Sequence, residues 1–84
     1  MITVAIVDDH VDVLDEMSRS LANESDISVV ATATSGSVAI QEFVQHQPDI
    51  VLVDLVLPDT TGPALIVQLR AALPNASFLV VSAY

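Results

Sequence analysis

The sequence contains two short apolar runs, and each of them ends at aspartate residues. Residues 2–7 are followed by Asp8 and Asp9, and residues 50–53 are followed by Asp54. Apolar runs of this length are typical of strands that are buried on both faces, in the middle of a parallel sheet. Ligands of open parallel sheets bind at the carboxyl ends of the strands. If the two strands are neighbours, we expect the three carboxylates to meet at that edge and to require a counter-charge.

The length and composition limit the chain to a single small domain. A domain of 84 residues buries only about 60–65% of the surface of its unfolded chain. The apolar fraction of 52% is high for such a domain, so we expect part of the apolar surface to contact a partner. There is no cysteine, which excludes disulfides, thiolate nucleophiles and thiolate metal sites in this chain.

The charge and hydropathy of the chain argue against binding to nucleic acid and against a membrane span. The net charge is -9, with only Arg19 and Arg70 as basic residues and no lysine. Direct binding of DNA usually requires about six to ten phosphate contacts from basic side chains, so this chain is not expected to bind nucleic acid. No apolar run approaches the roughly 18 residues of a membrane span, and the N-terminus lacks the basic region of a signal peptide. We therefore expect a cytoplasmic protein that binds cations or basic partners.

The remaining sequence alternates between strand and helix patterns. Apolar residues recur at helical spacing in three segments between the expected strands. Ser35 is predicted to cap the second helix and Gly62 to cap the third, with Pro63 at its first position. His10 is close enough in sequence to contact the acidic site, but a surface position is the expectation for both His10 and His46. The predicted strands are residues 2–7, 27–33, 50–54 and 78–81, and the predicted helices begin near residues 11, 36 and 63.

Several motifs, in this order, resemble the receiver domain of two-component response regulators. They are IVDDH at residues 6–10, PDIVLVDL at 48–55, Pro58, Gly62, and VVSA at 80–83. The resemblance covers the whole chain and implies a flavodoxin-like α/β fold, with a parallel sheet and helices on both faces. A full receiver has five strands in the order 2-1-3-4-5, and 84 residues accommodate about four strands and three helices. We therefore expect residues 1–84 to form a receiver-like domain without the fifth strand, its lysine and the last helices.

The resemblance also implies roles for individual residues. Asp54 corresponds to the phosphoacceptor, and Asp8 and Asp9 correspond to ligands of Mg²⁺. Asp54 and the backbone carbonyl of Val56 complete this ligand set, and Ser82 corresponds to the switch hydroxyl that meets the phosphoryl group. The phosphoryl donor is a sensor histidine kinase, a phosphotransfer protein or a small acyl phosphate. Such a domain is a signalling input to an output partner, typically a transcriptional one, and is not an enzyme in the usual sense.

Two other functions and one assembly state follow from the same sequence. A last strand at residues 78–81 without a neighbour would leave an open sheet edge, so we expect a homodimer or a domain-swapped oligomer that completes the sheet. The main alternative function is a receiver-derived interaction or assembly module that no longer handles phosphate. A phosphate-ester hydrolase with an aspartate nucleophile is weaker, because such enzymes carry a second aspartate where this sequence has Val56.

Overall fold

The computed structural model describes residues 1–81 and contains alternating strands and helices. The predicted order of strands and helices is confirmed. The elements are β1 (Ile2–Val7), α1 (Val11–Ala22), β2 (Ile27–Ala33), α2 (Gly36–His46), β3 (Ile50–Asp54), α3 (Gly62–Ala72) and β4 (Ser77–Val81). No helix in this part of the chain has the length and apolarity required to cross a membrane.

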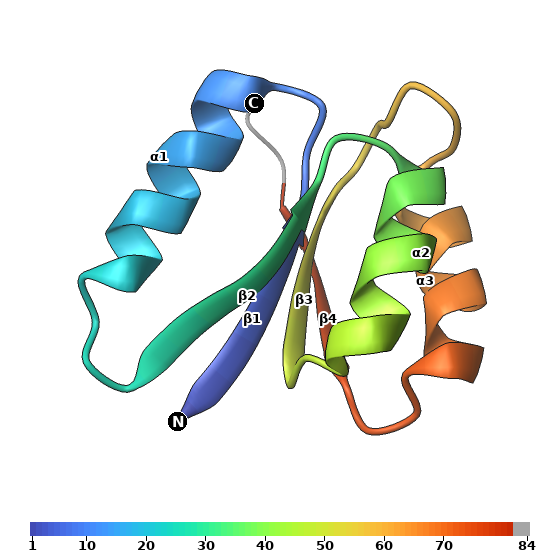
Figure 1. Cartoon of the computed structure of the whole chain (residues 1–84). Coiled ribbons are helices and arrows are strands. Elements are labelled where there is room, and N and C mark those ends of the chain that lie inside the picture. Colours follow the sequence, from blue (N-terminus) through green and yellow to red (C-terminus); the bar gives the residue numbers. More distant parts are fainter. Residues whose placement is uncertain (82–84) are drawn as a thin grey trace.

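The strands form a single parallel sheet in the order β2-β1-β3-β4. Strands β1 and β3 are direct neighbours, and Val7 pairs with Val53 at their carboxyl ends. All four strands run in the same direction, from the end where the N-terminus lies toward the opposite end of the molecule (Figure 1). The sheet therefore has the flavodoxin-like order that the sequence predicts, and it brings the two aspartate-bearing strand ends together.

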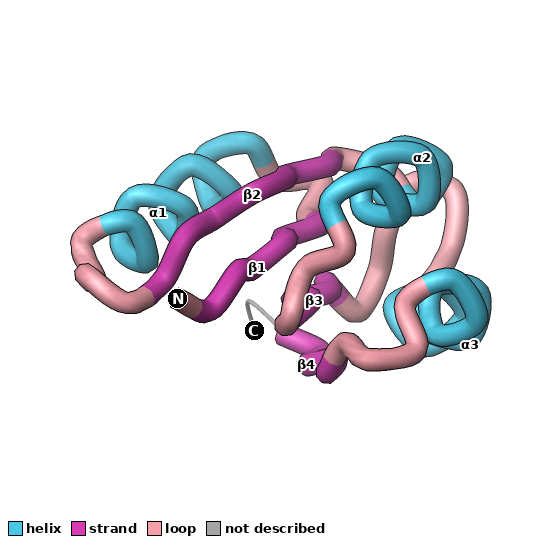
Figure 2. Tube along the Cα trace, turned by 60° about the horizontal axis from the view of Figure 1, so that its bottom comes forward, coloured by secondary structure: helices cyan, strands magenta, loops and turns pink. Residues whose placement is uncertain are grey.

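Helix α1 covers one face of the sheet, and α2 and α3 cover the other (Figure 2). Side chains along β1 point alternately to the two faces of the sheet. Ala5 and Val7 belong to the core under α2 and α3, and Val4 and Ile6 belong to the core under α1. Burial is more complete on the two-helix face, where Phe43 and Leu65 are fully buried. In α1 only Leu14 is buried.

Hydroxyl side chains cap α2 and α3. Ser35 accepts a hydrogen bond from the backbone N–H of Val38 at 3.3 Å, as predicted. The predicted cap at Gly62 is wrong: Thr61 is the cap of α3, and its hydroxyl accepts from the backbone N–H of Ala64 at 3.3 Å. Gly62 is needed for a different reason, because a Cβ atom there would lie 2.6 Å from the backbone oxygen of Asp54. The glycine allows the start of α3 to pack closely against the end of β3.

At the amino-terminal end of the sheet, Asp49 joins three strands. Its carboxylate accepts hydrogen bonds from the backbone N–H and the hydroxyl of Thr3, at 2.9 and 3.0 Å. The backbone oxygen of Asp49 accepts from the N–H of Ser77 at 2.9 Å. The backbone hydrogen bond from Thr3, and then its hydroxyl, hold the pKa of Asp49 below its ordinary value of 3.8. These bonds fix the relative register of β1, β3 and β4.

Candidate functional site

Two neighbouring strands deliver the acidic residues to one edge of the sheet. Asp8 and Asp9 follow β1 directly, and Asp54 is the last residue of β3. The backbone N–H of Asp8 donates to the oxygen of Ala33 in β2 at 3.0 Å, which holds this strand end in place. The short connection to α1, which begins at Val11, leaves little freedom for the chain to carry these aspartates away from the edge.

The side chains of Asp8, Asp9, His10 and Asp54 form one cluster. Each residue offers one ligand atom, and these four atoms all lie within 4.8 Å of one another. The expected meeting of the three carboxylates is therefore observed. Asp8 and Asp54 have side chains that are only 9% and 11% exposed, so their charges are poorly screened by water. A positive charge near these carboxylates would therefore stabilise their ionised forms.

Asp54 shows the effect of this environment on a single carboxyl group. Burial is the main cause that raises its pKa above the ordinary value of 3.8, and the charge of Asp8 raises it further. A hydrogen bond from the backbone of Leu55 and the proximity of His10 partly oppose the shift. A cation bound among the carboxylates would remove the repulsion, and carboxylate oxygens are the ligands that Mg²⁺ prefers in proteins. The residues present therefore fit a divalent cation.

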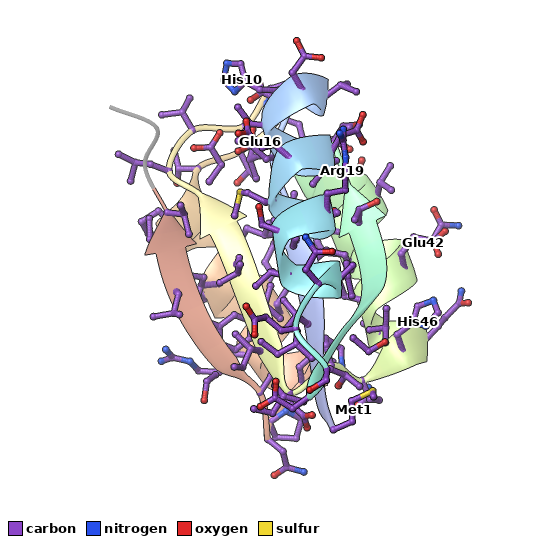
Figure 3. All side chains as sticks on the ribbon, turned by 90° about the vertical axis from the view of Figure 1, so that its left-hand side faces the viewer. Met1, His10, Glu16, Arg19, Glu42 and His46 are labelled. Carbon is purple, nitrogen blue, oxygen red and sulfur yellow. The ribbon has the colours of Figure 1, made fainter. Side chains whose placement is uncertain are left out.

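His10 is the member of the cluster for which the sequence favoured a surface position over a contact with the site. Its ring is indeed 59% exposed, but Nδ1 lies 3.1 Å from oxygens of both Asp8 and Asp9. The hydrogen bond with Asp8, and then the charge of Asp9, raise the pKa of His10 above 6.5. His10 lies at the start of α1, at the opposite end of the molecule from His46 (Figure 3). Its position two residues after Asp8 was the available signal, because His10 donates its backbone N–H to that carboxylate at 2.8 Å.

The comparison with known proteins identifies the family. Residues 4–84 match the family model of the response regulator receiver domain. The chain belongs to this family. It is 36% identical over 83 residues to the response regulator protein VraR of Staphylococcus saprophyticus, a match that covers 99% of this chain and 40% of that protein. Receiver domains are signalling domains and not classical enzymes.

Solved receiver structures have the same arrangement of strands and helices. The NarL signal receiver domain from Mycobacterium tuberculosis matches with a TM-score of 0.90 and 26% identity, over 99% of this chain and 67% of that one. RcsB from Salmonella enterica serovar Typhimurium, solved on promoter rprA with the phosphomimetic BeF₃⁻, matches with a TM-score of 0.88 and 25% identity. That match covers 96% of this chain and 47% of RcsB. The chain thus spans less than half the length of VraR and of RcsB.

The structure does not test the roles predicted for Val56 and Ser82. Val56 lies in the loop after β3, where it forms an isolated bridge with Thr61, and its side chain is 61% exposed. The loop is held by the N–H of Gly62, which donates to the oxygen of Leu55 at 2.8 Å. The role of the Val56 carbonyl as a metal ligand stays a prediction. Ser82 lies outside the described residues, and its role as switch hydroxyl also stays a prediction.

Asp59 is an acidic residue of the same receiver loop that serves a structural purpose. Its carboxylate accepts hydrogen bonds from the backbone N–H groups of Gly36 and Ser37, at 2.8 and 3.0 Å. These bonds, led by the one from Gly36, lower the pKa of Asp59 below 3.8. Asp59 therefore binds the first backbone N–H groups of α2, a helix that is distant in sequence.

Proposed function

We propose that this chain is the phosphoacceptor receiver domain of a two-component response regulator and that it takes a phosphoryl group on Asp54. The observation that carries the proposal is the meeting of Asp8, Asp9 and Asp54 within 4.8 Å at the carboxyl ends of β1 and β3. Among the described residues, Asp54 is the only one of the three aspartates that lies within a strand. Its backbone is packed against Gly62, which gives the nucleophile a fixed position.

In the proposed reaction, a carboxylate oxygen of Asp54 attacks the phosphorus of a phosphohistidine or of an acyl phosphate. A new P–O bond forms, the P–N or P–O bond of the donor breaks, and the electron pair leaves with the imidazole or the carboxylate. Asp8, Asp9 and Asp54, with the carbonyl of Val56, would hold Mg²⁺, which supplies positive charge to the phosphoryl oxygens. The low exposure of Asp54 limits the access of water to the product.

The partners follow from this chemistry and from the relatives. The phosphoryl donor is a sensor histidine kinase or a phosphotransfer protein. The hydroxyl of Ser82 donates a hydrogen bond to the phosphoryl group on Asp54, which shifts the population of two states. The domain comprises residues 1–84, and it regulates an output partner that acts in transcription, as suggested by the promoter-bound RcsB relative. Direct contact between this chain and nucleic acid is not part of the proposal, because the chain has a net charge of -9.

Beryllofluoride tests the proposal, because it mimics a phosphoryl group on an aspartate. We expect ¹⁹F NMR of the wild-type chain with Mg²⁺ to show a bound fluoride resonance that disappears with EDTA. Asp54→Asn should abolish this resonance. Asp49→Asn is the matched control, because it makes the same change at the other end of β3, and it should retain the resonance. A wild-type spectrum without bound fluoride, from a folded protein, would contradict the proposed function.

A second function is supported by the outer edge of β4. Within residues 1–81, β4 pairs only with β3, and the side chains of Leu79 and Val80 are 55% and 46% exposed. We propose that this edge associates with a second copy of the chain, as a two-fold dimer or by exchange of an element. Without phosphorylation, the same edge would make the chain an interaction or assembly module. The charge of each copy opposes association, so the dimer should strengthen with salt.

Sedimentation at tens of micromolar checks this assembly. We expect a dimer for the wild type and a monomer for Leu79→Lys. Val67→Lys, which introduces the same charge at an exposed position of α3, is the matched control and should remain dimeric. A wild-type chain that sediments as a monomer in both low and high salt would contradict the assembly.

A further inference from the structure

We propose that His10 is a ligand of the metal held by the aspartate cluster, which makes this a mixed nitrogen and oxygen site that binds Mn²⁺, Co²⁺ and Ni²⁺ more tightly than Mg²⁺. The inference rests on the proposed function only in that Asp8, Asp9 and Asp54 bind a divalent cation. It adds a ligand of a different chemical type and therefore a different order of metal preference.

The distances from Nδ1 of His10 to the three carboxylates fall within the range for ligands around one ion. With metal–ligand bonds of about 2.1 Å, adjacent ligands of an octahedral ion lie about 3.0 Å apart and opposite ligands about 4.2 Å apart. Nδ1 of His10 lies 3.1 Å from an oxygen of Asp8 and 3.1 Å from an oxygen of Asp9. Its distance to an oxygen of Asp54 is 3.8 Å. One proton on Nδ1 cannot point at all these oxygens, whereas one ion can contact Nδ1 and the carboxylates together.

The backbone of His10 is fixed before any metal binds. Its N–H donates to Asp8 at 2.8 Å, and its carbonyl accepts the first hydrogen bond of α1, from the N–H of Leu14 at 2.9 Å. Only the two side-chain torsions of His10 remain to be set, so ordering the ring for coordination costs little conformational entropy. The exposed side of the ring faces solvent, and the Nδ1 side faces the carboxylates. The ring can therefore stay in place when an ion enters.

The chemical type of the ligand determines which metals benefit. Mg²⁺ prefers oxygen ligands and keeps several waters, so an imidazole adds little to its binding. Imidazole suits first-row transition metals, whose affinity for such sites rises from Mn²⁺ through Co²⁺ to Ni²⁺. Loss of His10 should therefore reduce the affinity for Ni²⁺ and Co²⁺ by about tenfold or more, the scale of well-placed groups at metal sites. The affinity for Mg²⁺ should change by less than about threefold.

The test compares metal binding in the wild type, His10→Asn, His10→Gln and His46→Asn. Calorimetric titrations with Mg²⁺, Co²⁺ and Ni²⁺ give the affinities, and pulsed electron paramagnetic resonance of bound Mn²⁺ detects a coordinated imidazole nitrogen. We expect the nitrogen coupling in the wild type and in His46→Asn, which alters the other histidine, at the far end of the molecule. Both His10 variants should lose the coupling, and their affinity for Co²⁺ and Ni²⁺ relative to Mg²⁺ should fall by about tenfold. Circular dichroism confirms that each variant is folded.

The outcomes separate this inference from the proposed function. If the wild type binds Mn²⁺ without nitrogen coupling, or if both His10 variants keep the wild-type ratio of Ni²⁺ and Co²⁺ affinity to Mg²⁺ affinity, His10 is not a ligand. The proposed function would still stand if Mg²⁺ and beryllofluoride form the adduct on Asp54. If the folded wild type binds none of these ions, both the histidine ligand and the metal-dependent phosphoacceptor are wrong.

Discussion

The two ends of β3 carry the same type of residue in opposite circumstances. Asp49, just before the strand, accepts hydrogen bonds from the backbone and the hydroxyl of Thr3, which lower its pKa. Asp54, at the other end, lies beside Asp8 and Asp9, and burial together with the charge of Asp8 raises its pKa. The difference shows that the surrounding groups, and not the residue type, decide whether the pKa of an aspartate is lowered or raised.

Asp59 extends the comparison to a third environment. It lies in the same loop region as Asp54, yet the backbone N–H groups at the start of α2 satisfy its carboxylate and lower its pKa. Asp49 and Asp59 thus have fixed donors, whereas the main neighbours of Asp54 are other acids. A site with unmatched charge costs stability in the free protein, and such local conflict is typical of functional sites.

The largest expected effect comes from the packing that positions Asp54. Gly62→Ala would place a Cβ atom 2.6 Å from the backbone oxygen of Asp54, and backbone cannot rotate away as a side chain can. We expect a loss of about 2–3 kcal/mol in the free energy of unfolding, measured by urea denaturation. Gly36→Ala is the matched control, because its new Cβ meets the side chain of Thr60, which can move. If the two variants are equally stable, the close packing of β3 against α3 does not hold Asp54 in place.

Neutralising Asp49 and Asp54, at the two ends of β3, should change the stability of the fold in opposite directions. Without metal, Asp54→Asn relieves repulsion with Asp8 and should stabilise the fold by about 1 kcal/mol. Asp49→Asn weakens the hydrogen bonds to Thr3 and should lower the melting temperature. Thermal unfolding in EDTA measures both. A destabilised Asp54→Asn protein would show that the charge of Asp54 supports the fold in some other way.

The dependence of stability on pH should separate the same groups with a smaller effect. The pKa of Asp49 and of Asp59 is lowered in the folded state, so their contribution is present above 3.8 and is lost as the pH falls below that value. The pKa of Asp54 is raised, so its cost appears as the pH rises above 3.8 and disappears on acidification. As the pH falls from about 6 to 3.8, we expect Asp54→Asn to lose stability more steeply than the wild type. Below 3.8, Asp49→Asn should lose stability less steeply. Parallel curves for all three proteins would contradict these environments.

Much of this fold could be predicted because its signals are local. The apolar runs before Asp8 and Asp54 indicate buried strands, and the parallel order brings their ends together. The cap of α3 was not predicted correctly, because the role of Gly62 depends on packing. Gly62 allows close contact with the backbone of Asp54, and Thr61 is the residue that caps the helix. Periodicity carries no information about such contacts.

The long-range polar contacts were the least predictable part. The bonds from Gly36 and Ser37 to Asp59 join two loops, and nothing in either segment indicates the other. His10 was placed correctly at the surface, but its approach to three carboxylates depends on the pairing of β1 with β3. Side chains at loop positions can be assigned a partner only when the neighbouring strand ends are known.

The most direct test of the central claim, that the carboxyl end of β3 is a metal-dependent phosphoacceptor, is intact mass measurement after incubation with acetyl phosphate. With Mg²⁺, we predict that the wild type and Asp49→Asn gain the mass of one phosphoryl group. Asp54→Ala, and the wild type in EDTA, should gain none. A wild-type chain that stays unmodified with Mg²⁺, or an Asp54→Ala chain that is modified to the same extent, would contradict the claim.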